Sequence, residues 1–143
     1  MKWLLWTQIA LVLASVGVGV IAAMSVPYGA MVPFAMGALP LLLIAGAVLG
    51  LLAVRRKTAH IPAAIALLAP VALIVVSELS TDYEPVTDYA GLVPFDAGEL
   101  LVWLNWVWWL DLAAAALALM SALLLFRLTL VRRTVDRQDR LPD

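Results

Sequence analysis

The chain of 143 residues contains no cysteine and a single histidine, His60. The absence of cysteine excludes disulfide bonds, thiolate metal sites and thioether attachment of haem. One imidazole also excludes a bis-histidine haem within a single copy of the chain. We therefore expect the protein to carry no cofactor and no bound metal.

Charged residues are also scarce, at 13% of the chain, whereas 65% of the residues are hydrophobic and the mean hydropathy is +1.04. A soluble domain of this length could not bury so much apolar surface, so a lipid bilayer must cover part of it. Four apolar runs cover residues 3–24, 36–54, 60–77 and 100–130. Each is long enough to cross a hydrocarbon core of about 30 Å as a helix. The sequence predicts an all-α integral membrane protein, a single domain over residues 1–143 with four transmembrane helices in a bundle.

Basic residues are missing from two of the three connections between these runs. All nine Lys and Arg residues lie before the first run, between the second and third, or at and after the end of the fourth: Lys2, Arg55, Arg56, Lys57, Arg127, Arg132, Arg133, Arg137 and Arg140. The positive-inside rule then places both termini in the cytoplasm, and we expect the plasma membrane. Residues 78–99 become an acidic extracytoplasmic loop, and residues 131–143 a basic cytoplasmic tail suited to anionic lipids or an acidic partner.

The first run has a second interpretation, as a cleaved signal peptide, because Met1 and Lys2 precede a long apolar stretch. That stretch is longer than a usual signal-peptide core, and Ala22-Ala23-Met24-Ser25 is a poor cleavage site. We expect the helix to be retained. Cleavage would leave three helices and an external N-terminus.

A short pattern, Y-x-x-x-V-P-F-x-x-G, occurs at residues 28–37 and again at residues 89–98. It suggests two tandem helical hairpins related by an axis along the membrane normal. Chance similarity is the alternative, because the similarity does not extend into the flanking helices, where Leu and Ala are too common to judge. The Tyr, Pro, Phe and Gly residues of the pattern suit ordinary turns at the membrane interface. In a functional interpretation, the two copies form paired loops that dock a partner through Tyr28, Pro33, Phe34, Tyr89, Pro94 and Phe95.

Asp111 interrupts the fourth run. The uninterrupted segment Leu112–Phe126 has 15 residues, about 22 Å of helix, which is shorter than the ~30 Å core. Arg127 can extend its long side chain to the headgroups, but an aspartate cannot. Asp111 is therefore expected inside the hydrocarbon region, where a charge costs about 2–3 kcal/mol unless it is paired or protonated.

Small residues predict where helices pack closely. At about 100° per residue, Asp111 shares one helix face with Trp108 and with the small residues Ala114, Ala118 and Ala122. Gly46 and Gly50 form a similar pair in the second run.

We name Asp111, Trp108 and Asn105 as a candidate intramembrane polar site. The site is either a proton- or cation-responsive group or a structural staple. A staple would be hydrogen-bonded to Trp108, Asn105, Ser77 or a partner chain.

No large soluble domain, nucleotide motif or catalytic constellation is recognisable. We expect no enzyme and no nucleic-acid partner, but a non-catalytic membrane subunit that assembles, anchors or stabilises a larger membrane protein complex. The alternative is a small proton-coupled transporter or channel, acting as a parallel homo-oligomer around Asp111. The one-sided distribution of basic residues opposes an antiparallel pair.

Overall fold

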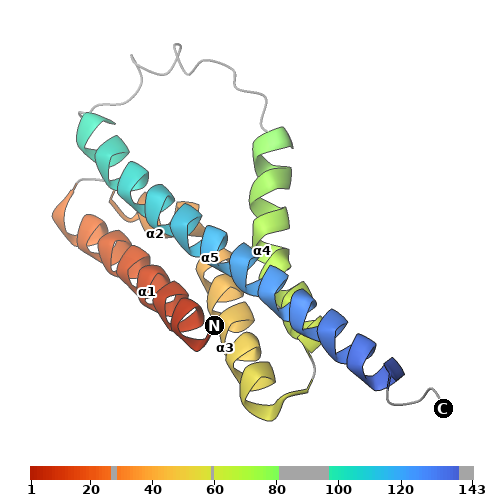
Figure 1. The fold of residues 1–143 in the computed structure, drawn as a ribbon. Helices are drawn as coiled ribbons and strands as arrows, with labels where there is room; N and C mark the ends of the chain where they lie inside the picture. The colour runs from red at the N-terminus through yellow and green to blue at the C-terminus, as the bar shows by residue number, and fades with distance from the viewer. Residues whose placement is uncertain (27–28, 59, 81–96, 139–143) are drawn as a thin grey trace.

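The structure, a computed structural model, describes residues 1–26, 29–58, 60–80 and 97–138, and nearly all of them are helical. The helices are α1 (Lys2–Ser25), α2 (Met31–Met36), α3 (Leu39–Arg56), α4 (His60–Ser80) and α5 (Ala97–Gln138). No strand occurs within these ranges. Figure 1 shows the arrangement of the helices.

Four of these helices are long and apolar enough to cross a membrane: α1, α3, residues 60–79 of α4 and residues 98–131 of α5. This confirms the predicted number of candidate spans and the all-helical fold class. α5 continues without a break to Gln138, so the backbone of the expected tail is helical over residues 131–138.

The second run begins later than the predicted boundary at residue 36. Residues 31–36 form the short helix α2, and Gly37 then adopts a left-handed backbone with φ of 55°. Glycine takes this conformation without the steric cost of a side chain. Pro40 lies in the first turn of α3, where its missing N–H would have no helical partner. The Gly37 turn therefore separates α2 from α3.

Most described charged residues lie near one of the two ends of the molecule, and Asp111 and Arg127 lie within α5. In Figure 1 the N-terminus, the turn between α3 and α4, and the C-terminal end of α5 lie towards the same side of the molecule, with the end of α5 projecting away from the other two; we call this side the basic end after Lys2, Arg55 and Arg56. The opposite end carries Glu78 and Glu99 and is called the acidic end.

Helices α1 and α4 each pack on both α3 and α5, and α3 and α5 also contact each other. Small residues allow these approaches. A Cβ atom placed on Gly46 would lie 2.9 Å from the carbonyl oxygen of Ala66, so the backbones of α3 and α4 nearly touch there. Gly50 packs against Leu5 of α1 and Leu67 of α4.

The buried apolar side chains form two separate clusters. The basic-end core is the larger and includes Leu5, Val12, Leu43 and Leu125. The acidic-end core joins Ala22 of α1, Val32 and Met36 of α2, and Leu100 and Val107 of α5. Along α5 the change from one core to the other falls between Val107 and Ala114. The described residues thus contain a polar layer at the level of Asp111.

Candidate intramembrane polar site

Among the described residues, four polar side chains of α1 and α5 are buried: Gln8, Ser15, Asp111 and Ser121. The buried residues of α1 recur every three or four positions, at 5, 8, 12, 15, 19 and 22. This spacing marks one helix face, and both Gln8 and Ser15 lie on it. We call these four residues the polar seam.

Asp111 is the only acidic residue of the polar seam, and it is 3% exposed. The hydroxyl of Ser15 on α1 interacts with its carboxyl group. However, neither Ser15 Oγ nor Asp111 Oδ1 has a well-formed hydrogen bond within the described part of the chain. The centre of the polar seam therefore contains buried oxygen atoms that lack a hydrogen-bond partner within the described part of the chain. Such unpaired buried atoms are uncommon in folded proteins.

The rest of the polar seam is also incompletely paired. Gln8 Nε2 donates a hydrogen bond of 2.8 Å to the Leu43 carbonyl oxygen of α3, which ties α1 to α3. Gln8 Oε1 and Ser121 Oγ, by contrast, have no partner among the described residues. The unpaired oxygen atoms therefore extend from the level of Asp111 towards the basic end.

A cavity of about 110 Å³ adjoins Asp111 beneath α2. We call it the Asp111 cavity. Its walls come from three helices: Val32, Met36, Leu39, Leu104, Val107, Trp108 and Asp111. Asp111 is the only charged residue among them, so a buried carboxyl group borders an otherwise mainly apolar space.

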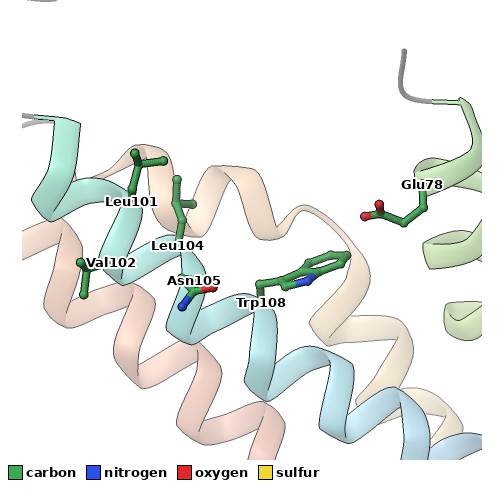
Figure 2. Close-up of a pocket in the computed structure, with 6 residues that line it drawn as sticks. All are labelled: Glu78, Leu101, Val102, Leu104, Asn105 and Trp108. Atoms are coloured by element: carbon green, nitrogen blue, oxygen red, sulfur yellow. The ribbon is translucent and has the colours of Figure 1, made fainter. Parts of the chain in front are cut away.

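A larger, open groove of about 680 Å³ lies between α4 and α5 at the acidic end. We call it the α4–α5 groove. The two helices pack against each other over part of their length but diverge towards the acidic end (Figure 1). Figure 2 shows the Trp108 indole extending from α5 towards Glu78 on α4. The groove is lined by Glu78, Leu101, Val102, Leu104, Asn105 and Trp108.

Trp108 and Leu104 belong to the walls of both spaces. Trp108 is 38% exposed. The Asp111 cavity and the α4–α5 groove are therefore neighbours that share these two residues.

Comparison with known proteins does not identify the chain. No protein-family model matches it, and no curated protein or solved structure is similar to it. What the site does must therefore be inferred from its own residues.

The structure brings together two of the three polar residues named from the sequence. Asp111 and Trp108 border the same cavity, whereas Asn105 is exposed and lies in the α4–α5 groove. The residue that interacts with the carboxyl group is Ser15, not one of the expected staple partners. Ser77 instead donates its hydroxyl hydrogen to Ile74 of its own helix, at 2.9 Å.

Sequence reasoning missed Gln8, Ser15 and Ser121 as members of the site, although their spacing held the information. Gln8 and Ser15 are seven residues apart and therefore share a helix face. Ser121 lies ten residues after Asp111, about 2.8 helical turns, and so falls about 80° away from it around α5. The intramembrane polar residues of both helices could have been placed on two facing stripes.

The packing residues named from the sequence lie in helix contacts. Ala114, Ala118 and Ala122 are fully buried in the basic-end core, and Gly46 and Gly50 are buried against neighbouring helices.

The expected docking loops are mostly outside the described residues. This applies to Tyr28, Tyr89, Pro94, Phe95 and the side chain of Phe34. Pro33 is described; it is exposed and lies in helix α2, not in a loop. Its neighbour Val32 is fully buried in the acidic-end core. Val32, the valine of the first copy of the Y-x-x-x-V-P-F-x-x-G pattern, therefore anchors α2.

The chemistry open to this site is binding and proton exchange. Within the described ranges, no three His, Cys, Asp or Glu side chains are grouped so that they could hold a metal ion. The polar seam offers one carboxyl group, two hydroxyl groups and one amide. These groups can hold a proton or a single positive charge.

Proposed function

We propose that the protein is a non-catalytic subunit of a larger complex in the plasma membrane, which it helps to assemble, anchor or stabilise. Its four apolar helices would form a bundle across the bilayer. The one-sided distribution of basic residues supports an orientation with both termini and the basic end in the cytoplasm. Under this proposal the acidic end faces the opposite side.

The α4–α5 groove is the observation that carries this proposal. Its wall combines the apolar side chains Leu101 and Val102 with the polar groups of Asn105 and Glu78. Lipid tails can fill an apolar groove but cannot form hydrogen bonds with an amide such as that of Asn105. A membrane-spanning helix of a partner protein can do both, particularly one with a hydroxyl side chain near its outer end. We therefore infer that such a helix occupies the groove.

Blocking the groove is expected to release the partner. Leu101 is 61% exposed in the groove, so Leu101→Trp should obstruct it without disturbing the two cores. We expect the amount of partner that co-migrates with the tagged protein on a native gel to fall about tenfold, equivalent to ~1.4 kcal/mol of binding free energy. The protein would be extracted from its native membrane in a mild detergent.

Leu123→Trp is the matched control, because Leu123 has a similar exposure on the same helix and does not line the groove. This variant should recover the partner as the wild type does. The absence of any stoichiometric partner from the wild-type preparation would refute the proposal. Equal loss of the partner in both variants would show that the partner does not bind in the groove.

A second function, proton-coupled transport or conduction by a parallel oligomer, is favoured by one specific observation. Asp111 is buried beside a cavity, and its Oδ1 atom has no hydrogen-bond partner among the described residues. A purely structural aspartate would normally have its oxygens satisfied by protein donors. The unpaired oxygen instead leaves a position at which a proton or a positively charged ligand can bind.

Replacement of Asp111 by asparagine is the test of this second function. In proteoliposomes with an imposed pH gradient, we expect Asp111→Asn to abolish any proton-dependent flux, since the amide cannot exchange a proton at ordinary pH. Glu78→Gln is the control at the acidic end and should retain the flux. A wild-type protein with no flux above that of empty liposomes would rule this function out.

A further inference from the structure

We propose that the Asp111 cavity binds a tertiary or quaternary ammonium group, a ligand class that neither proposed function specifies. The inference does not depend on which of those functions holds, because the purified chain alone would bind the ligand. It rests on the charge, the number of hydrogen-bond acceptors, the aromatic wall and the volume of the cavity.

Charge is the first consideration. Among the described residues, Asp111 is the only charged residue in the wall of the cavity. Within the described part of the chain, neither this wall nor that of the α4–α5 groove contains Lys, Arg or His. The residues around Asp111 therefore favour a cation and offer it no competing positive group.

The number of acceptors distinguishes among cations. Apart from Asp111, the cavity wall consists of aliphatic side chains, the thioether of Met36 and the indole of Trp108, which is a donor. A primary ammonium has three N–H donors, and most of them would be buried without acceptors. A metal ion would need more oxygen ligands than one carboxylate and one hydroxyl supply. A quaternary ammonium has no donor and a tertiary one has a single donor, so both match this wall.

Trp108 supplies the remaining recognition element. Trp108 lines both the cavity beside Asp111 and the groove, where its indole extends towards Glu78 (Figure 2), and the face of an indole attracts alkylammonium groups. A volume of about 110 Å³ suits a small cationic headgroup and not a long molecule. The α4–α5 groove shares Trp108 and Leu104 with the cavity, so a longer substituent would extend past these side chains into it.

Three compounds of similar shape test the proposal on the unmodified protein. Choline carries a quaternary ammonium, 3,3-dimethylbutan-1-ol replaces that nitrogen with carbon, and ethanolamine carries a primary ammonium. We would measure saturation-transfer NMR signals of the choline methyl groups with full-length protein in a maltoside detergent. Choline should bind at least about tenfold more tightly than either analogue. Equal displacement of choline by the neutral alcohol would overturn the proposal.

Variants then locate the binding site. Asp111→Asn should weaken choline binding at least about tenfold, Trp108→Leu by several-fold, and Trp108→Phe less than Trp108→Leu because a ring remains. Glu99→Gln should leave the affinity within about threefold, since Glu99 is exposed on α5 and lines neither the cavity nor the groove. Choline binding by Asp111→Asn that equals wild-type binding would exclude this site, provided that the variant has wild-type helix content and elutes as a single species.

The same ammonium chemistry occurs in lipid headgroups and in free metabolites, and the membrane composition separates these sources. In nanodiscs of phosphatidylglycerol, choline should bind as it does in detergent. In nanodiscs of phosphatidylcholine, loss of choline binding would identify the lipid headgroup as the ligand. Unchanged binding would identify a free cation.

Discussion

Replacement of Ala118 by leucine is expected to destabilise the protein by overpacking the contact between α5 and its neighbours. Ala118 is fully buried, with no solvent-accessible surface, and it lies in the basic-end core. Three extra carbon atoms there would force apart helices that small residues allow to approach. Overpacking of this kind costs about 1–3 kcal/mol. We expect the unfolding midpoint in detergent to fall by about 3–10 °C.

Ala113→Leu is the control for this prediction, because Ala113 is exposed on the same helix and the substitution is identical. Its unfolding midpoint should change little. Both midpoints would be measured by scanning fluorimetry at one scan rate, because unfolding of membrane proteins in detergent is rarely reversible. Equal midpoints for the two variants would show that the small-residue face of α5 does not pack as described.

Gly46→Ala is the second change with a large expected effect. The added Cβ atom would lie 2.9 Å from the Ala66 carbonyl oxygen, and a backbone atom cannot move aside as a side chain can. Alanine favours a helix over glycine by about 1 kcal/mol, but separating α3 from α4 should cost more than this gain. We expect a net loss of about 1–2 kcal/mol, measured as a lower unfolding midpoint.

Two other glycines provide a graded comparison. A Cβ atom on Gly17 would have no neighbour within 4 Å, so Gly17→Ala should be neutral or slightly stabilising. On Gly50 it would lie 3.1 Å from a Leu5 methyl group, which can rotate away, so Gly50→Ala should have an intermediate effect. The prediction fails if the three midpoints do not follow the order Gly17, Gly50, Gly46 from highest to lowest.

The positions of the long helices were predictable because they depend on local composition. Each apolar run had to be long enough to cross a membrane as a helix, and its ends were marked by charge or proline. The face of α5 that carries Asp111 followed from helix geometry alone. Helix α2 was not predicted, because six residues are too few to show a periodic pattern and Pro33 suggested a turn.

The partner of Asp111 depended on information that a single sequence does not contain. Which residue of α1 lies opposite Asp111 depends on how far α1 and α5 slide along each other, and that is decided by packing over the whole contact. Ser15 was recognisable as part of a small-residue face, but Leu5, Gln8 and Val12 occupy the same face. The cavity similarly required the position of α2, which brings Val32 and Met36 over Asp111.

The length of α5 gives the protein a mechanical property. The helix has 42 residues, and no proline or glycine follows Gly98 within it, so it lacks the usual causes of a kink. Gln138 lies 27 residues beyond Asp111, about 40 Å along the axis. A tilt of about 10° around Asp111 would therefore displace the far end by about 7 Å. Because no kink interrupts α5, a tilt at the level of Asp111 would be carried along the whole helix to its far end.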